Sequence, residues 1–213
     1  MEYLSQLGQD RFIDEFFKEK RNGVFVDIGA HEGVHISNTF FLEKERGWTG
    51  ICIEPLPVEF KKLNENRNSI NLNVGVSDFD GEADFTYIEG YANMLSGISE
   101  KHNQAHRERI LNEVNHYGGK INNIKVPIRK LQGILDEHNS LDVDFCSIDT
   151  EGSEFNIVKS IDFSRTNIKV FIIENNYNET TIKEFLETKG YSLYKKLGWD
   201  DVFIKNELIN NEQ

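Results

Sequence analysis

Short, uninterrupted apolar runs, each followed by a helix-like segment, constrain the fold of this chain more than any other feature. The runs are residues 24–28 (VFVDI), 50–54 (GICIE), 143–149 (VDFCSID) and 169–175 (KVFIIEN). Helical patterns follow them at residues 35–47, 58–67, 153–161 and 179–190. Strands that are apolar throughout are buried on both faces, and their alternation with helices is typical of a parallel sheet covered by helices on each side. The sequence therefore predicts an α/β fold.

The rest of the chain adds further elements to this pattern. A helix is expected from residue 9, a third strand at 70–76 and a fourth, alternating strand at 82–88, while 191–205 is expected to form a hairpin around Gly198. Residues 90–119 interrupt the alternation with polar, histidine-containing sequence. We expect one domain spanning residues 1–213, in which 90–119 lies over the site as a lid or acceptor-site insertion.

Charge and composition exclude several classes of partner. The net charge of -12 argues against a nucleic-acid partner, because proteins that bind a duplex neutralise its phosphates with basic side chains. No stretch reaches the roughly 20 apolar residues that span a bilayer, and the first residues lack the pattern of a secretory signal. Both cysteines, Cys52 and Cys146, lie within apolar runs, which is typical of a reducing compartment. A cytoplasmic protein with a small or neutral substrate is expected.

The turn after the first strand, Asp27-Ile-Gly29-Ala-His-Glu-Gly33, indicates the cofactor. Ligands of an open α/β sheet bind beyond the carboxyl ends of its strands, and glycines there permit a tight turn and close approach. A nicotinamide dinucleotide site requires G-x-G-x-x-G, but His31 and Val34 occupy the second and third glycine positions. Glu54, at the end of the second strand, suits a ribose diol. Asp27 suits the cationic amino-acid end of S-adenosylmethionine better than it suits a pyrophosphate.

Several longer stretches resemble the FkbM-type S-adenosylmethionine-dependent methyltransferases. They are GQDRFIDEFF, GVFVDIGAHEGVHISNTFFLEKERGWTGICIEPLP, NVGVSDFDGEADF, MLSGI, VDFCSIDTEGSEFNIVKSIDF and VFIIEN. The resemblance implies a doubly wound, mostly parallel seven-stranded sheet that ends in an antiparallel hairpin. It also implies O-methylation of a hydroxyl, with a sugar or glycan as the favoured acceptor. The chain departs from the general methyltransferase pattern at the middle glycine of the turn, which is His31 here.

The resemblance assigns cofactor-binding roles by matching position. The expected cofactor-binding residues are Gln9, Asp27, Gly29, Ala30, Gly33, Glu54, Pro55, Val76, Ser77 and Asp149. Among them Glu54 is expected to hold the ribose hydroxyls, with Pro55 and Leu56 beside the adenine and Val76 and Ser77 at its edge. Asp149 is expected at the methyl end, and Gln9 is expected to fold over the cofactor.

Two chemistries remain open for the acceptor, because an alcohol needs a general base or a metal before it can attack. In one group of methyltransferases with this fold, a divalent cation is bound at the ends of the fourth and fifth strands. The equivalent donors here are Asp149, Glu174 and Asn175, which suit Mg²⁺ or Mn²⁺. In the metal-free alternative, Asp149 or Glu151 orients the acceptor, and His31 or another histidine takes the proton.

Three other functions compete with methylation of a sugar. One is methylation of a non-sugar small molecule. The second is an NAD-dependent oxidoreductase, which the missing glycines disfavour. The third is a non-catalytic domain that binds the cofactor without turnover, which the presence of Asp27, Glu54 and Asp149 disfavours.

Overall fold

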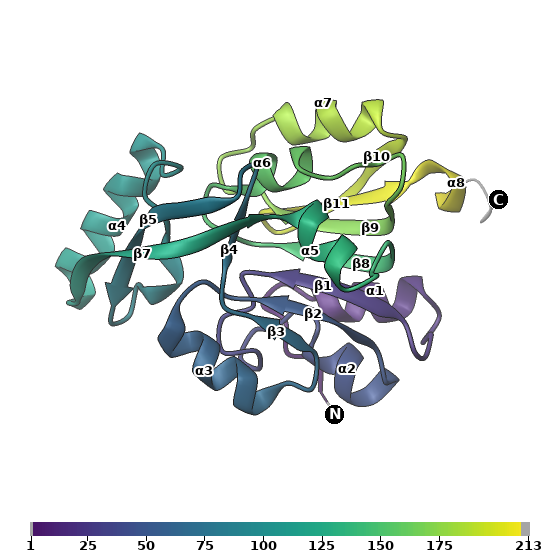
Figure 1. Ribbon diagram of the computed structural model, residues 1–213, viewed down its shortest axis with the longest axis horizontal. Coiled ribbons are helices and arrows are strands. Elements are labelled where there is room, and N and C mark those ends of the chain that lie inside the picture. Colours follow the sequence, from purple (N-terminus) through teal and green to yellow (C-terminus); the bar gives the residue numbers. More distant parts are fainter. Residues whose placement is uncertain (1, 210–213) are drawn as a thin grey trace.

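A computed structural model describes residues 2–209 and contains two sheets. The large sheet has seven strands in the order β10-β11-β9-β8-β1-β2-β3 (Figure 1). Its strands are β1 (Val24–Ile28), β2 (Thr49–Ile53), β3 (Ile70–Leu72), β8 (Asp142–Ile148), β9 (Asn167–Glu174), β10 (Tyr191–Leu197) and β11 (Asp200–Lys205). The strands from β9 to β3 pair in parallel, whereas β11 pairs antiparallel with both β9 and β10. The predicted α/β sheet with a C-terminal antiparallel hairpin is therefore confirmed.

Helices cover both faces of the large sheet because its central strands are apolar on both sides. One face packs against α1 (Gln9–Phe16), α2 (Phe40–Arg46), α3 (Pro57–Asn66) and α8 (Asn206–Ile209). The other face packs against α5 (Leu131–Glu137), α6 (Glu154–Lys159) and α7 (Thr181–Thr188). Successive residues of β1 alternate between the two layers, with Phe25 in the first and Val26 in the second. Within residues 2–209, no helix combines the length and the apolar character that crossing a membrane requires.

The second sheet corrects the sequence prediction. Residues 70–76 form two separate strands, β3 in the large sheet and β4 (Gly75–Ser77) in a four-stranded sheet of order β4-β7-β5-β6. The expected strand at 82–88 also belongs to this second sheet, as β5 (Gly81–Glu89), and pairs antiparallel with β7 (Lys120–Lys130). The expectation of a single strand at residues 70–76 was therefore wrong, because β3 and β4 belong to different sheets.

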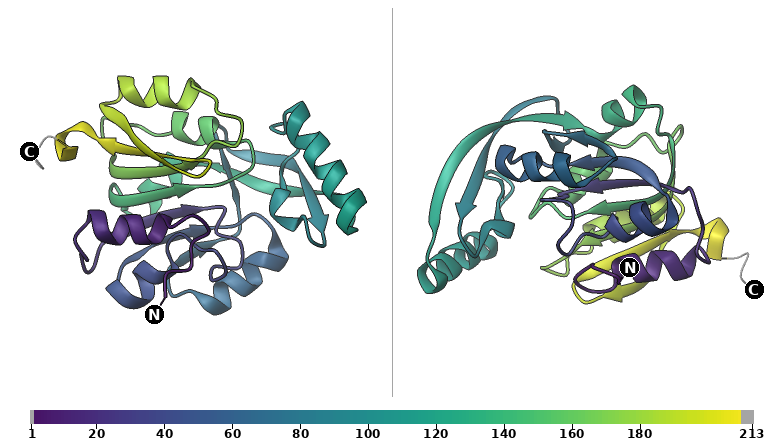
Figure 2. Two further views of the ribbon diagram at one scale, coloured as in Figure 1. Left: turned by 180° about the vertical axis from the view of Figure 1, so that it is seen from behind. Right: turned by 90° about the horizontal axis from the view of Figure 1, so that it is seen from below.

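Residues 90–119, predicted as a loop and helix, extend the long β5–β7 hairpin into an arm. The arm consists of η1 (Asn93–Leu95), β6 (Gly97–Ile98) and α4 (Gln104–Tyr117) together with the hairpin. The views in Figures 1 and 2 show it projecting beyond the large sheet. Ile88 of β5 and Ile110 of α4 belong to one small buried cluster, which holds the helix against the hairpin.

The segment before α2 is irregular, and a buried arginine organises it. A helix was expected from residue 35, but Ile36 has a positive φ of 52° and α2 begins only at Phe40. Arg67, which is 4% exposed, donates to the carbonyl oxygen of Gly33 at 3.1 Å and to Thr39 Oγ1 at 2.9 Å. Thr39 Oγ1 in turn donates to Asp27 Oδ2 at 2.6 Å. The guanidinium also pairs with Glu43 Oε2 at 2.8 Å, so one side chain joins α2, α3 and the turn after β1.

Replacing Arg67 with alanine is expected to lower the free energy of unfolding by about 3–5 kcal/mol, because it leaves a buried carboxylate without its partner. Urea unfolding followed by circular dichroism measures this loss. Arg165→Ala is the matched control, since Arg165 pairs with Asp136 and Asp162 at the surface and its loss should change stability little. Equal stabilities of the two variants would show that Arg67 does not organise this segment.

Candidate functional site

The turn after β1 lies in contact with the turn after β8. Gly29 has a φ of +87°, and a side-chain carbon at this position would overlap the carbonyl oxygen of Asp149. The backbone N–H groups of Gly29 and Ala30 donate to the carbonyl oxygen of Ile53, at 3.0 and 3.1 Å. The N–H of Asp149 donates to the carbonyl oxygen of Ile28 at 3.0 Å. Glycine is therefore required at position 29 by its conformation and by the neighbouring chain.

Glu54, at the end of β2, is buried beside this turn. Its Oε2 accepts a hydrogen bond from the N–H of His31 at 2.9 Å, and its Oε1 accepts one from the N–H of Leu56 at 2.8 Å. Burial raises the pKa of Glu54 to about 7, although these two hydrogen bonds favour the ionised form. The side chain is thus fixed in position by the backbone.

A cavity lies at the carboxyl ends of β1, β2 and β8 and beside the start of β4, and we call it the cofactor cavity. The predicted site residues that line it are Gly29, His31, Glu54, Pro55, Leu56, Val76, Asp149 and Glu151. Asn93, Met94, Ser96 and Ile98 of the arm also line it, so the MLSGI stretch forms part of its wall. Strands far apart in the sequence thus bring half of the ten expected cofactor-binding residues to one cavity.

Other predicted residues lie outside its lining. Gln9 donates to Asp200 Oδ2 at 2.8 Å and accepts from the N–H of Leu7, so its amide is engaged at the start of α1. Asp27 is buried beneath the turn, where its carboxylate accepts a hydrogen bond from the Thr39 hydroxyl. Burial raises its pKa. Ser77 is buried at the end of β4. Gly33, with a φ of +84°, packs against Leu63 and Arg67, and Ala30 is buried within the turn.

Three carboxyl groups converge beside the cofactor cavity, and we call Asp149, Glu151 and Glu174 the acidic group. One oxygen from each lies within 4.8 Å of the others. Asp149 lines the cofactor cavity, and burial together with the charges of Asp200 and Glu154 raises its pKa to about 7. Burial and the neighbouring carboxylates also raise the pKa values of Glu151 and Glu174 well above the usual range. The proximity of the three carboxyl groups therefore disfavours ionising all of them together, and a bound cation would relieve that repulsion.

The amide of Asn175, predicted as a metal donor, is engaged elsewhere. Its Nδ2 donates to Asp201 Oδ2 at 2.7 Å and to the carbonyl oxygen of Glu179 at 2.9 Å, while its Oδ1 accepts from the N–H of Glu179. Glu151 occupies the third place in the acidic group instead. Glu151 lies in the turn after β8, where it has a positive φ of 57°.

A second cavity of about 320 Å³ opens on the other side of the acidic group. It lies among the start of α4, α6 and the loop before α7, and Glu151 lines both this second cavity and the cofactor cavity. Glu174, Tyr177 and His106 line only the second. The two cavities therefore meet at one carboxyl side chain.

His106 and Tyr177 were not among the predicted site residues. His106 is 1% exposed, and its Nε2 lies 3.1 Å from the carbonyl oxygen of Leu95. This contact assigns the proton to Nε2 and leaves Nδ1 as an acceptor, 3.2 Å from the hydroxyl of Tyr177 and 3.3 Å from Glu151 Oε2. Tyr177 follows a strand end, which is a signal that sequence reasoning had available. His31 lies instead in the cofactor cavity, 3.2 Å from Asn93 Nδ2, and burial lowers its pKa.

The chain was compared with protein-family models, curated proteins and solved structures. A family model described as the methyltransferase FkbM domain matches residues 27–193, whereas a search of curated proteins gave no match. Among solved structures, the METTL16 methyltransferase domain is 12% identical, with a TM-score of 0.49, and the alignment covers 94% of this chain and 67% of that one. The N-terminal domain of human METTL16 is 12% identical, with a TM-score of 0.48, and the alignment covers 92% of this chain and 67% of that one. A candidate RNA methyltransferase from Pyrococcus horikoshii is 12% identical, with a TM-score of 0.45, and the alignment covers 93% of this chain and 83% of that one.

The raised pKa of Glu54 predicts a loss of stability as the pH rises. Near its usual pKa of 4.5 the unfolded chain releases this proton, while the folded chain retains it until about pH 7. The free energy of unfolding should therefore fall between these values, by up to about 3 kcal/mol from this group. In Glu54→Gln the difference between urea unfolding at pH 5 and at pH 8 should shrink. The exposed control Glu65→Gln should keep the wild-type difference, and an equal fall in all three proteins would exclude Glu54 as its source.

Proposed function

The chain belongs to the methyltransferase FkbM domain family, and on that premise we propose that it transfers a methyl group from S-adenosylmethionine to a hydroxyl of a sugar or glycan. The observation that carries the proposal is the meeting of two cavities at Glu151. One cavity has the glycine turn and strand-end acid suited to the methyl donor, and the other has room for an acceptor. Methyl transfer is an in-line displacement, so it requires two ligands that meet across a short gap.

We propose that the cofactor cavity holds S-adenosylmethionine. Glu54 would hold the ribose hydroxyls, which can donate to a carboxylate that the backbone has already positioned. Pro55, Leu56 and Val76 would flank the adenine, and Asp149 would face the methionine end. Asp27, Ala30, Gly33 and Ser77 would support these contacts from behind the lining, and Gln9 would do so through Asp200.

The chemistry of the site supports an oxygen acceptor. S-adenosylmethionine supplies a methyl group on a positively charged sulfur, which leaves as a neutral thioether when an oxygen lone pair attacks. The acceptor hydroxyl must lose its proton in this step, and Glu151 in its ionised form is placed to take it. Within the described residues, Oε2 of Glu151 is buried and makes no hydrogen bond, which leaves it open to accept that proton. An amine acceptor would need no such base.

The charge of the second cavity supports a neutral acceptor. Its lining includes Glu100, Glu151, Glu154, Glu174 and Glu179. These carboxylates would repel phosphates, so a nucleic acid is disfavoured as acceptor. Amide, hydroxyl and carboxyl groups that donate and accept hydrogen bonds suit a polyol, although a non-sugar alcohol would find the same partners. The two free, buried cysteines support a reducing compartment such as the cytoplasm.

We further propose that residues 1–213 work as one methyltransferase domain in which residues 90–119 control access to the acceptor. Residue 1 and residues 210–213 lie outside the described part of the chain. Within 90–119, Asn93, Met94 and Ser96 line the cofactor cavity, while Asn103 and His106 line the second cavity. The arm thereby contributes walls to both sites.

Binding of S-adenosylhomocysteine tests the cofactor site. Isothermal titration calorimetry should detect binding of S-adenosylhomocysteine to the wild-type protein and should detect no binding of NAD. Glu54→Ala should weaken that binding by roughly 2–4 kcal/mol, because it removes two charge-assisted hydrogen bonds to the ribose. Glu65→Ala, an exposed change on α3, should leave the affinity unchanged. Unchanged affinity in Glu54→Ala would refute the placement of the ribose.

The acidic group fits a divalent cation, and we propose that Asp149, Glu151 and Glu174 hold Mg²⁺ or Mn²⁺. Oxygen ligands and three negative charges suit these hard cations. The hydrogen bond between Asp149 and Glu174 requires a proton that such a cation would displace. A bound cation would lower the pKa of an acceptor hydroxyl.

EDTA is expected to abolish methyl transfer to the acceptor, and Mg²⁺ or Mn²⁺ should restore it. Transfer of labelled methyl groups to a panel of sugars and small alcohols measures this. Asp149→Asn should raise the metal concentration required by about tenfold, whereas Asn175→Ala, whose amide lies outside the acidic group, should retain the wild-type requirement. Full turnover in excess EDTA would exclude the cation and leave Glu151 as the base.

A further inference from the structure

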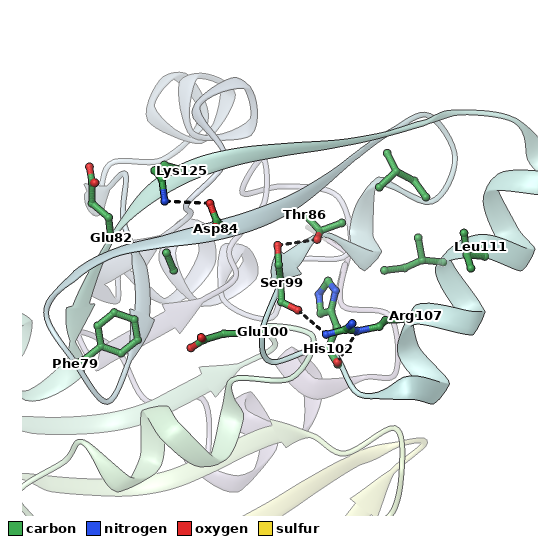
Figure 3. Close-up of a pocket in the computed structure, with 13 residues that line it drawn as sticks. Phe79, Glu82, Asp84, Thr86, Ser99, Glu100, His102, Arg107, Leu111 and Lys125 are labelled. Carbon is green, nitrogen blue, oxygen red and sulfur yellow. Dashed lines mark hydrogen bonds and ion pairs between the residues drawn. The ribbon is translucent and has the colours of Figure 1, made fainter.

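The arm carries a groove of about 610 Å³ that belongs to neither cavity described above. Figure 3 shows it between the β5–β7 hairpin, α4 and the turn that follows β6. Glu82, Asp84 and Thr86 alternate along one face of β5, and Lys125 of β7 stands opposite Asp84. The other face of the same hairpin is buried, with Phe85 and Val126 in a hydrophobic cluster. Only one face of the hairpin is therefore available to a ligand in the groove.

Donors and acceptors are mixed along this groove. The hydroxyls of Thr86 and Ser99 lie 2.8 Å apart, and Lys125 Nζ lies 3.1 Å from Asp84 Oδ1. Arg107 donates to the carbonyl oxygen of His102 at 3.0 Å and to that of Ser99 at 3.3 Å. Opposite charges within the lining nearly balance, which disfavours a polyanion. Hydroxyl groups, which both donate and accept, match such a surface.

Apolar side chains alternate with these polar groups. Phe79 stands at one end of the groove and Leu111 of α4 at the other (Figure 3), and Ile121 of β7 also lines the groove. Leu111 is 53% exposed and Ile121 is 41% exposed. A sugar ring presents apolar C–H faces as well as hydroxyl edges, so a chain of sugars can contact both kinds of side chain. The volume falls within the range of about 300–1,000 Å³ that is typical of ligand sites.

The groove adjoins the second cavity. Glu100, in the turn after β6, lines both. Gly97 of β6 lies against the backbone of Thr150 and Glu151, since a side-chain carbon there would stand 3.3 Å from each carbonyl oxygen. The same carbon would collide with His102, which lines the groove. A single strand thus separates the groove from the turn that carries Glu151.

From this shared lining at Glu100 we propose that the groove holds the extended part of a neutral oligosaccharide whose terminal sugar occupies the second cavity. The inference rests on the proposed function, because it takes the second cavity as the site of the reacting hydroxyl. It narrows the acceptor from any sugar to a chain of several sugars. The groove then supplies binding energy remote from the reacting oxygen.

Binding and turnover of sugars of different length test this assignment. The probes are malto-, chito-, laminari- and manno-hexaose with their monosaccharides, and a 20-nucleotide oligouridylate as the polyanion. Calorimetry on the full chain with S-adenosylhomocysteine should show at least one hexasaccharide binding at least tenfold more tightly than its monosaccharide. Thr86→Trp, which fills the centre of the groove, should weaken hexasaccharide binding at least tenfold and leave monosaccharide binding unchanged.

Two further variants separate groove occupancy from folding. Leu111→Ala, an exposed change on α4, should weaken hexasaccharide binding several-fold. Lys120→Trp adds the same indole as Thr86→Trp at an exposed end of the hairpin outside the groove lining and should leave binding at the wild-type level. Binding of all hexasaccharides no tighter than the monosaccharides, or equal binding by Thr86→Trp and Lys120→Trp, would overturn the assignment.

Measuring methyl transfer to the same sugars distinguishes a failure of the groove assignment from a failure of the proposed function. Hexasaccharide binding that Thr86→Trp abolishes, without methyl transfer to any sugar, would refute the proposed reaction while supporting the groove. Methyl transfer to monosaccharides, without any gain from chain length, would support the reaction and overturn the groove. Selective binding of the oligouridylate would overturn the groove assignment in favour of a nucleic acid.

Discussion

The site depends on the contact between two turns that follow adjacent parallel strands, β1 and β8. Because Gly29 has no side chain, the backbone after β1 can lie against the carbonyl oxygen of Asp149. The register between the strands then fixes the glycine turn relative to the acidic group. Arg67 holds the first turn from below through Gly33 and Thr39. The relative position of the two cavities is thus set by the sheet itself, whereas the arm supplies their outer walls.

The central sheet could be predicted because its strands are apolar on both faces, and such runs have few other structures open to them. The second sheet could not, since β5 and β7 bury only one face and much of α4 is polar, which weakens every periodic signal. The division between β3 and β4 also escaped prediction. There Asn73 donates from its side chain to the carbonyl oxygens of Glu54 and Pro55, a contact between segments distant in the sequence.

In the candidate site too, residues next to the apolar strands could be predicted, whereas contacts made by the arm could not. Glu54 was predicted because a strand end places its next residue at the ligand edge of a parallel sheet, whereas the role of Asp149, also at a strand end, came from the family resemblance. Asn175 also follows a strand, but its amide turns toward Asp201 and Glu179, while the positive φ of Glu151 brings that residue into the acidic group. His106 comes from the arm, so only the tertiary structure brings it to Glu151.

One continuous segment, residues 93–106, forms a wall of the cofactor cavity and a wall of the second cavity. A ligand in either cavity that prefers one position of this segment changes the affinity of the other cavity. Because binding free energies are reciprocal, the factor is the same in both directions. Under the proposed assignment of the two cavities, this shared wall would couple the binding of the methyl donor to the binding of the acceptor.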